Sequence, residues 1–340
     1  MPAPREVLIR TVGSGLCHSD LHAIDGTAMP RRPIIVPGHE ASGIVEAVGS
    51  DVTYVKPGDH VITCLSVFCG ECEQCTTGHT NLCDNTEVKL MPGVARRLKW
   101  KGQVLHQAFN LSVFAEQMVV HEHAVVKIGK DIPLDRAALV GCGVMTGVGA
   151  ALNVADIGYG DTVLVIGCGA VGLAAIQGAV MAGAGAVIAA DLDDAKLALA
   201  AKLGATATVN ATRDDPVEVV RAATKGRGAD VVLEAAGHPA AFRCTAEAVR
   251  PGGQIIWLGK IDVANDVSFR WGSLMSEKRI RRSSYGGARP ARDFPLLAQA
   301  YLDGRLKLDE LISGRITLDD INRGFDDLRA GNAIRTVIEF

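Results

Sequence analysis

Residues 162–191, TVLVIGCGAVGLAAIQGAVMAGAGAVIAAD, decide the fold class of this chain. An apolar stretch ends in the pattern G-x-G-x-x-G, a helix-forming stretch follows, and a second apolar stretch ends at Asp191. The run without charge up to Ala190 is long enough to span a bilayer, but its glycines interrupt it. Parallel strands covered on both faces are apolar throughout, so a buried strand–helix–strand unit explains the pattern better.

The alternation of helices and strands continues after Asp191. We expect further helices and strands in turn over residues 193–204, 205–210, 216–226, 229–237, 240–250 and 254–259. Alternating elements of this length are typical of βαβ units. The sequence therefore predicts an α/β protein with a doubly wound parallel sheet of the Rossmann type.

The remaining residues have a different texture. Strand-like stretches and turn signals occupy the part before residue 66, and the part after Tyr285 has two amphipathic helices and a final strand. These stretches cover residues 6–15, 42–49, 59–65, 293–304, 318–331 and 336–340. We expect one β-rich domain formed by residues 1–143 and 285–340, and a dinucleotide-binding domain formed by residues 144–284.

Length and charge restrict the class of function. A chain of 340 residues favours about two domains. A net charge of −3 gives no electrostatic reason to bind nucleic acid or an anionic membrane. The first ten residues, MPAPREVLIR, carry charges where a secretion signal needs an apolar stretch, so we expect a cytoplasmic protein.

Four cysteines form a cluster within residues 66–90. Cys69, Cys72, Cys75 and Cys83 have the spacing C-x2-C-x2-C-x7-C. Four thiolates this close in sequence can surround one zinc ion, as in structural zinc sites. Two disulfides would need an oxidising compartment, and iron–sulfur proteins commonly use other spacings. The pattern favours a structural zinc lobe inserted into the β-rich domain.

The glycine pattern predicts a site for a dinucleotide. Gly167 allows a tight turn, Gly169 lets the backbone approach a pyrophosphate, and Gly172 allows close helix packing. The helix N-terminus offers N–H groups to the phosphates. Asp191 would accept hydrogen bonds from ribose hydroxyls and repel a 2′-phosphate, which favours NAD over NADP. A plain glycine turn between a strand and a helix is the simpler alternative.

Three further stretches suggest a second metal site. They are GLCHSDLH at 15–22, GHE at 38–40 and GCG at 141–143. Cys17, His39 and Cys142 would supply two thiolates and one imidazole, leaving a fourth position open as in catalytic zinc sites. A single buried cysteine is more often a small apolar residue. On residue chemistry alone, both interpretations stay open.

The chain resembles the zinc-dependent medium-chain alcohol dehydrogenase family from Pro4 nearly to its end. The motifs are GLCHSDLH, PGHEASGIVEAVG, the four-cysteine lobe, VGCGVMTGVGAA, VIGCGAVG with Asp191, and GNAIRTVI. The resemblance implies a GroES-like catalytic domain beside the Rossmann domain. It also implies that Cys17, His39 and Cys142 hold a catalytic zinc, and that the four cysteines hold a structural one.

The resemblance assigns roles to neighbouring residues. Glu40 matches a glutamate near the metal, and Asp20 matches a carboxylate that orients the zinc histidine. Ser19 and His22 match a relay that receives the hydroxyl proton; without the resemblance, a turn serine and a surface histidine would be favoured. Further matches are cofactor contacts at His18, Thr146, Val171, Lys196 and Arg335, and substrate-pocket positions at Leu65, Ala108 and Phe109, which could equally be core.

The implied activity is oxidation of a primary aliphatic or aromatic alcohol to an aldehyde, and the reverse, with NAD and two zinc ions per chain. A homodimer or homotetramer is also implied. Residues 87–114 resemble the glutathione-dependent formaldehyde dehydrogenase branch, where Arg97 matches a substrate-binding arginine. However, the acidic pair of that branch falls on Ala28 and Pro30, and His22 replaces its tyrosine. An alternative of another class is a non-catalytic NAD-sensing or structural protein.

Overall fold

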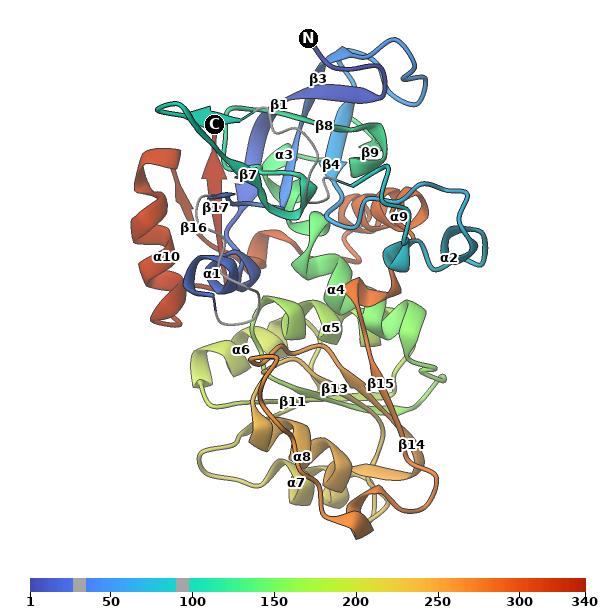
Figure 1. Ribbon diagram of the computed structural model, residues 1–340. Coiled ribbons are helices and arrows are strands. Elements are labelled where there is room, and N and C mark those ends of the chain that lie inside the picture. Colours follow the sequence, from blue (N-terminus) through green and yellow to red (C-terminus); the bar gives the residue numbers. More distant parts are fainter. Residues whose placement is uncertain (27–34, 90–97) are drawn as a thin grey trace. The chain divides into compact units, whose positions relative to one another are not determined.

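The computed structural model describes residues 1–26, 35–89 and 98–340, and the chain divides into two compact units (Figure 1). Unit 1 comprises Met1–Cys142 and Ala288–Phe340, and unit 2 comprises Gly143–Gly287. The second unit is therefore an insertion between two parts of the first.

Unit 2 contains a parallel sheet with the strand order β12-β11-β10-β13-β14-β15. The strands are β10 (Thr162–Ile166), β11 (Ala186–Asp191), β12 (Ala207–Asn210), β13 (Ala229–Glu234), β14 (Val249–Trp257) and β15 (Arg279–Arg282). In chain order this is 3-2-1-4-5-6, the order of dinucleotide-binding sheets. The chain reverses direction of winding between β10 and β13, and ligands bind at the carboxyl ends of the strands at such a point.

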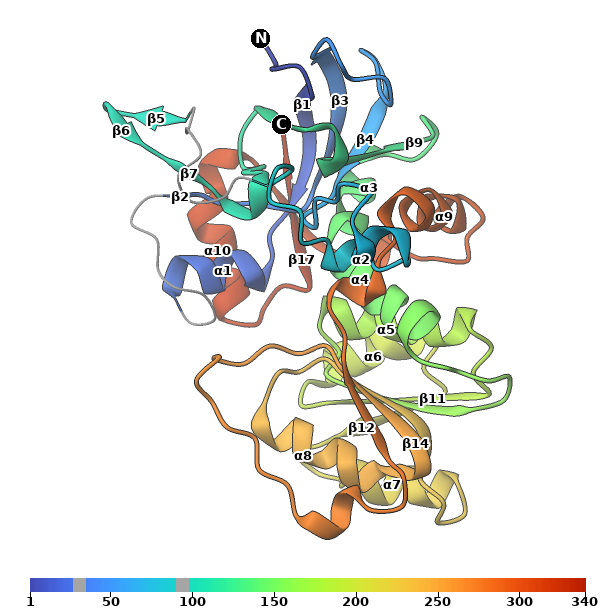
Figure 2. The ribbon, with the colours of Figure 1, turned by 45° about the vertical axis from the view of Figure 1, so that its right-hand side comes forward.

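Helices cover both faces of this sheet. Helices α5 (Ala170–Met181) and α6 (Asp194–Lys202) lie on one face, and α7 (Pro216–Ala223) and α8 (Pro239–Ala248) lie on the other (Figure 2). Proline begins α7 and α8, where a missing N–H is tolerated. Short helices α4 (Gly143–Gly149) and η5 (Ala150–Val154) precede the sheet, and η6 (Trp271–Leu274) and η7 (Tyr285–Gly287) flank β15. This arrangement confirms the predicted doubly wound sheet.

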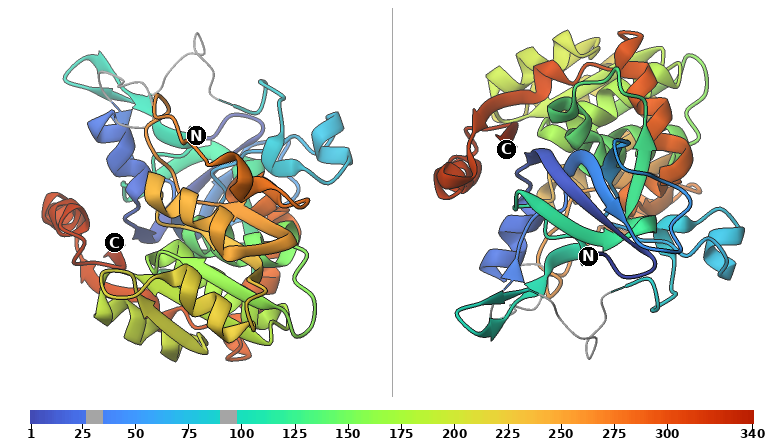
Figure 3. Two further views of the ribbon diagram at one scale, coloured as in Figure 1. Left: turned by 90° about the horizontal axis from the view of Figure 1, so that it is seen from below. Right: turned by 90° about the horizontal axis from the view of Figure 1, so that it is seen from above.

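Unit 1 is built on a mostly antiparallel sheet with the order β16-β17-β1-β3-β4-β9, and β8 also pairs with β1. The strands are β1 (Glu6–Gly15), β3 (Ala41–Val48), β4 (His60–Thr63), β8 (Gln117–His121), β9 (Val125–Ile128), β16 (Ile312–Ile316) and β17 (Arg335–Glu339). The right panel of Figure 3 shows β1 beside β3 and β8. Apolar residues of these strands form one core.

The other elements of unit 1 are short and surround this sheet. They are α1 (His18–Asp25), β2 (Ile35–Val36), α2 (Glu73–Thr76), η1 (Thr80–Leu82), β5 (Lys99–Trp100), β6 (Gln103–Val104), β7 (His106–Gln107), η2 (Ala108–Asn110), η3 (Glu122–Ala124), α3 (Leu134–Ala137), η4 (Ala138–Gly141), α9 (Pro290–Leu302), η8 (Asp309–Leu311), η9 (Leu318–Asp320) and α10 (Ile321–Arg329). Helix α1 begins one residue after Cys17, so its first turn carries several of the predicted site residues.

Several strands were not expected from the sequence, among them β2, β5 to β9, β15 and β16. Strand β15, RIRR, is exposed at every residue because it lies at the edge of its sheet, so no alternation of apolar and polar residues marks it. Strand β16, ISGRI, is also an edge strand and contains a glycine. Within the three described ranges, no single helix is long and apolar enough to cross a membrane. The consecutive pair Leu134–Gly141 and Gly143–Val154, which is bent, meets that test only when taken together.

Candidate metal centres and dinucleotide site

The four clustered cysteines of unit 1 lie around one point. The Sγ atoms of Cys69 and Cys75 and those of Cys72 and Cys83 are 3.9 Å apart, and those of Cys83 and Cys69 are 3.8 Å apart. Zinc–sulfur bonds of about 2.3 Å in a tetrahedron require sulfur atoms about 3.8 Å apart. The distances fit a zinc ion. All nine cysteines lie in the described ranges and none forms a disulfide.

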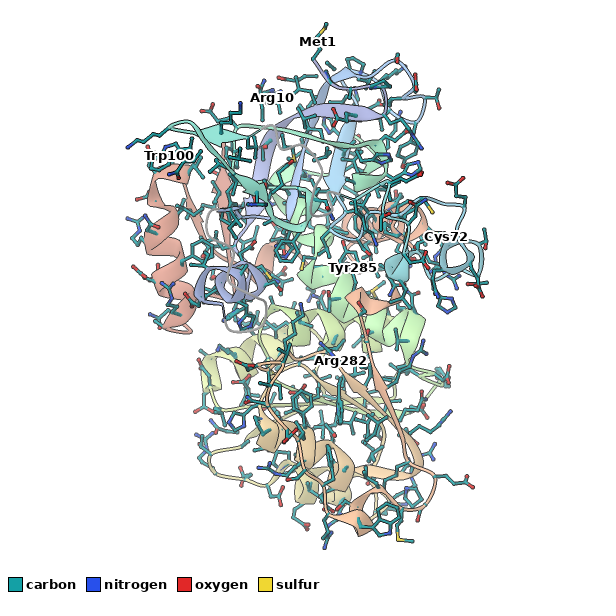
Figure 4. The ribbon with its side chains drawn as sticks, in the orientation of Figure 1. Met1, Arg10, Cys72, Trp100, Arg282 and Tyr285 are labelled. Atoms are coloured by element: carbon teal, nitrogen blue, oxygen red, sulfur yellow. The ribbon has the colours of Figure 1, made fainter. Side chains whose placement is uncertain are left out.

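Backbone groups of the lobe are also arranged to receive charge. The N–H groups of Glu71 and Cys72 point at Cys69 Sγ from 3.4 and 3.3 Å. Burial alone would raise the pKa of Cys69, but these N–H groups lower it to about 6. Cys72 lies on the excursion that holds α2 and η1 (Figure 4). These N–H groups thus stabilise the thiolate of Cys69, the form that binds metal, whereas burial raises the pKa of Cys75 to about 12 and also raises that of Cys83.

The lobe is attached to the rest of unit 1 by contacts near its start and in its middle. The backbone oxygens of Gly78 and Ala288 accept hydrogen bonds from Arg289 Nε and Thr80 Oγ1, each 3.0 Å long. His123 Nδ1 lies 2.8 Å from the backbone oxygen of Phe68, and the two rings stack with centroids 5.4 Å apart. These contacts fix the lobe's position on the β-rich core.

A second set of soft donors is buried in unit 1. Cys17, His39, Glu40 and Cys142 are all buried, and their ligand atoms lie within 4.8 Å of one another. His39 Nε2 is 3.2 Å from Cys142 Sγ. Two thiols and one imidazole with an acid beside them fit zinc with one position left for another ligand. The fold therefore brings together residues that lie far apart in the sequence.

Asp20 lies behind His39. Its Oδ1 atom accepts from His39 Nδ1 over 2.9 Å and from the Gly38 N–H over 2.9 Å. Burial alone would lower the pKa of His39, but Asp20 raises it to about 10. A carboxylate in this position fixes the tautomer that presents Nε2 to a metal and makes that nitrogen a better donor.

The electrostatics of this set depend on Arg335. The hydrogen bond between the two thiols holds the pKa of Cys17 well below its usual range, and Arg335 and His39 contribute in the same direction. The same hydrogen bond raises the pKa of Cys142. Arg335 is buried, its Nη1 donates to the Leu16 carbonyl over 3.0 Å, and its Nε is 3.6 Å from Glu40 Oε1. A divalent cation would allow both thiols to ionise.

The Arg335–Glu40 contact was missed by the sequence analysis, which expected Arg335 only as a pyrophosphate contact. The two residues are 295 positions apart in the numbering, and no spacing signal links them. Pairing of β1 with both β17 and β3 brings them together, since Gly15 is opposite Val337 and Ser14 is opposite Ala41. Only the strand register could have predicted this ion pair.

Phe109, a predicted pocket residue, contacts this set through His39. Its ring centroid is 4.4 Å from that of His39. Its backbone has φ 54° and ψ 23°, a left-handed conformation that is unusual for a bulky residue. Ala108 beside it is buried, and Leu65 is half-buried against the core. The ring contact places Phe109 beside His39, and the pocket roles of Ala108 and Leu65 stay predictions.

The predicted relay lies on α1. Ser19 and His22 are three residues apart on this helix, so their side chains lie on one face, and both are half-buried. His18 at the start of α1 is exposed, while Asp20 is buried. Helix α1 thus carries the buried carboxylate on one side and the two relay candidates on another.

The glycine turn of unit 2 has the geometry of a dinucleotide site. Gly167 has φ 93°, and a Cβ at Gly172 would lie 1.7 Å from the Gly167 carbonyl oxygen. A Cβ at Gly169 would meet nothing within 4 Å, so the space in front of the α5 N-terminus is open. Two glycines are required by close packing and the third leaves room for a ligand. This fits a pyrophosphate bound by helix N–H groups.

Asp191 ends β11 with its carboxylate fixed by three backbone N–H groups. Oδ2 accepts from Cys168 over 2.6 Å, and Oδ1 accepts from Leu192 and Asp193 over 2.7 and 3.1 Å. A carboxylate has about four acceptor positions, so it can still bind a ribose hydroxyl. Of the other predicted cofactor residues, Val171 lies on α5, Lys196 on α6 and Thr146 on α4, all half-buried.

The structure adds an arginine that the sequence analysis did not consider near Asp191. Arg213 binds Asp194 through Nη2 and Nη1, at 2.7 and 2.9 Å. Asn210, opposite Asp191 in the sheet, also donates to Asp194. An arginine in this region can accommodate a 2′-phosphate, but here its charge is already paired with a carboxylate.

Comparisons with known proteins identify the family of this chain. The family model for the alcohol dehydrogenase GroES-like domain matches residues 3–130, and the model for zinc-binding dehydrogenases matches residues 170–302. The chain is 37% identical to the S-(hydroxymethyl)glutathione dehydrogenase of Haemophilus influenzae over all of this chain and 92% of that protein. The chain belongs to the zinc-dependent medium-chain alcohol dehydrogenase family.

Solved structures of this alcohol dehydrogenase family share the fold. The benzyl alcohol dehydrogenase of Acinetobacter calcoaceticus is 31% identical with a TM-score of 0.92, covering 100% of this chain and 93% of that one. A zinc-binding dehydrogenase of Sinorhizobium meliloti bound to NADP is 27% identical with a TM-score of 0.83, at the same coverage. One of these two relatives is named for benzyl alcohol, and the other was solved with NADP bound.

Three residues used to weigh the glutathione-dependent branch of the alcohol dehydrogenase family lie outside the described residues. They are Ala28, Pro30 and Arg97. The sequence argument about them therefore remains a prediction.

Proposed function

We propose that this chain oxidises a neutral primary alcohol to an aldehyde, and catalyses the reverse reaction, with a catalytic zinc and NAD. The observation that carries the proposal is the buried set of Cys17, His39 and Cys142, with Asp20 behind the histidine. Three protein ligands leave a position for the substrate oxygen, which is the catalytic form of a zinc site. Membership of the family makes the chain an oxidoreductase.

The residues around the metal have separate tasks in this proposal. Bound zinc would lower the pKa of the substrate hydroxyl, and the nicotinamide would accept the hydride. Ser19 receives the hydroxyl proton and His22 passes it to solvent, because a neutral histidine can take a proton near neutral pH. Arg335 offsets part of the negative charge of the two thiolates and of Glu40. Phe109 holds the face of His39.

The cofactor proposal is NAD, with two zinc ions per chain. Asp191 would accept from the ribose hydroxyls and repel a 2′-phosphate, and Asp193 adds negative charge beside it. His18, Thr146, Gly167, Gly169, Val171, Gly172, Lys196 and Arg335 are the proposed cofactor contacts. The four-cysteine lobe would hold the second zinc, whose role is structural. A homodimer or homotetramer in the cytoplasm completes the proposal.

The S-(hydroxymethyl)glutathione dehydrogenase of Haemophilus influenzae favours a second candidate substrate, the glutathione adduct of formaldehyde. The adduct carries an amine and two carboxylates, and buried charges without partners are costly. Residues 27–33 contain no acid to meet the amine. Ala108 and Phe109 are apolar, which suits an alkyl or aryl group. We therefore favour the neutral alcohol.

The decisive experiment compares kcat/KM for benzyl alcohol, a medium-chain aliphatic alcohol, and formaldehyde with and without glutathione, each with NAD. We expect the neutral alcohols to be preferred. A preference above about tenfold for the glutathione adduct, roughly 1.4 kcal/mol, would instead establish the second candidate. NADH formation with none of them, by a zinc-loaded protein that binds NAD, would favour a non-catalytic NAD sensor.

A further inference from the structure

Glu234, the last residue of β13, is a buried carboxylate that has no role in the proposed chemistry. Its relative exposure is 0%. Oε1 accepts from the N–H groups of Ala236 and Gly237 over 2.9 and 2.7 Å. Oε2 has no hydrogen-bond partner within residues 1–26, 35–89 and 98–340, although the Gly259 N–H and the charge of Arg282 also favour the ionised carboxylate. Keeping such a group buried costs free energy, so its retention asks for a reason.

The carboxylate organises two loops at the carboxyl ends of β13 and β14. Gly237 has φ 65°, a conformation that favours glycine. A Cβ at Gly259 would lie 2.3 Å from the Gly237 nitrogen and 2.5 Å from Glu234 Oε2. The two loops therefore touch backbone to backbone around the Glu234 side chain, and neither can shift without the other.

The loop after β13, residues 235–237, also packs against the glycine turn that begins at Gly167. Glu234 is opposite Ile166 in the sheet, at the switch point between β13 and β10. The Ala235 N–H donates to the Ile166 carbonyl over 2.8 Å. A Cβ at Gly167 would lie 2.6 Å from the Ala236 nitrogen, one of the two groups that Glu234 binds. The position of Ala236 thus limits the position of the first turn glycine.

Asp230 offers an internal comparison, because it lies near the other end of the same strand. It is also buried, but it is paired with Arg227 and Arg250 and accepts from the Thr162 N–H. Its neighbours belong to the amino ends of the strands, away from the glycine turn. Asp230 therefore stabilises the same sheet without touching the proposed dinucleotide site.

We propose that Glu234 is a positioning residue for the dinucleotide: it fixes the 235–237 loop against Gly167 and so sets the phosphate-binding turn. The inference rests on the proposed cofactor site. It requires an acceptor oxygen at one place rather than a negative charge. Glutamine supplies that oxygen in the same place, whereas aspartate keeps the charge but is shorter by one methylene group and cannot reach both N–H groups.

The test measures NADH binding by calorimetry with the full-length, zinc-loaded protein and the variants Glu234→Gln, Glu234→Asp, Glu234→Ala and Asp230→Asn. We expect Kd within about threefold of the parent for Glu234→Gln and at least about tenfold weaker for Glu234→Asp and Glu234→Ala, since misplacement of a site by about 1 Å has effects of this size. Asp230→Asn should lower Tm and leave Kd within about twofold. For Glu234→Asp and Glu234→Ala, KM for NAD should rise by a larger factor than kcat falls.

The outcomes separate positioning by Glu234 from a general loss of stability, from an effect of charge and from failure of the cofactor site. Parent-like binding by Glu234→Asp overturns the inference, and so does equal weakening by Asp230→Asn, which would indicate general loosening. Loss of binding in Glu234→Gln with retention in Glu234→Asp would mean that the charge matters, which also contradicts positioning. If Glu234→Ala does not fold, the glutamine–aspartate pair still decides. If the parent protein binds neither NADH nor NADPH, the proposed cofactor site fails instead.

Discussion

Unit 1 gathers sulfur and imidazole donors, whereas unit 2, whose residues are all described, gathers glycines and carboxylates at the ends of parallel strands. In unit 1 the functional atoms are side chains, held by a sheet whose strands come from both ends of the chain. In unit 2 they are largely backbone N–H groups, held by close packing that excludes side chains. Substitution of one side chain should therefore damage chemistry most in unit 1 and ligand affinity most in unit 2.

The largest effect is expected for Cys17→Ser in unit 1. Serine is a poor zinc ligand, so the buried set would lose its metal and with it several kcal/mol of transition-state stabilisation, or about a thousandfold or more in kcat. Turnover, zinc content and thermal unfolding test this together. We expect about one zinc per chain and a folded protein; full activity with one zinc per chain would refute the assignment.

Cys83→Ser should act on the stability of unit 1. A structural zinc contributes folding free energy, so its loss should lower the free energy of unfolding by more than about 3 kcal/mol. Cys244→Ser in unit 2 is the matched control, because Cys244 lies in neither cluster. The comparison uses urea unfolding and metal analysis. Equal zinc content in Cys83→Ser and the parent would show that the lobe holds no metal.

Asp191→Ser in unit 2 tests whether this carboxylate sets the preference for NAD over NADP. The change removes an acceptor for the ribose and a charge that repels a 2′-phosphate, so the NAD-to-NADP ratio of kcat/KM should fall by roughly tenfold or more. Arg213 stays paired with Asp194 in this variant. A parent protein that uses both cofactors equally would show that Asp191 does not contact the ribose.

The smallest effect is the pH dependence contributed by Asp230. Burial alone would raise its pKa, but Arg227, the Thr162 N–H and Arg250 lower it to about 2. A depressed folded-state pKa contributes stability above the unfolded-state value of about 4, and that contribution is lost as pH falls toward 2.

Asp230→Asn should therefore cost about 1–2 kcal/mol at pH 7, because both arginines are partly exposed and screened. The difference from the parent should shrink below pH 4. Urea unfolding between pH 7 and pH 3 measures it. A difference that is constant over this range would mean that the pairing does not depend on the charge of Asp230.

Sequence reasoning predicted what is local and missed what depends on register. The four-cysteine lobe and the glycine turn could be predicted because all the residues of each site lie within one short stretch of sequence. Cys17, His39 and Cys142 were predicted through family resemblance, since their spacing alone carries no signal. The Arg335–Glu40 contact and the role of Glu234 depend on which strands lie side by side, and no sequence signal marks the left-handed backbone of Phe109. The edge strand β15 was missed because no buried face marks it.

The insertion of unit 2 into unit 1 has a consequence for synthesis on the ribosome. Unit 2 is contiguous and can fold as soon as its last strand has emerged, whereas β1 must wait for β17, more than 300 residues later in the sequence, to complete its sheet. Domains usually fold in the order in which they are made. Here the unit that begins first is completed last, and until then the edge of β1 that pairs with β17 remains open to pairing with other chains.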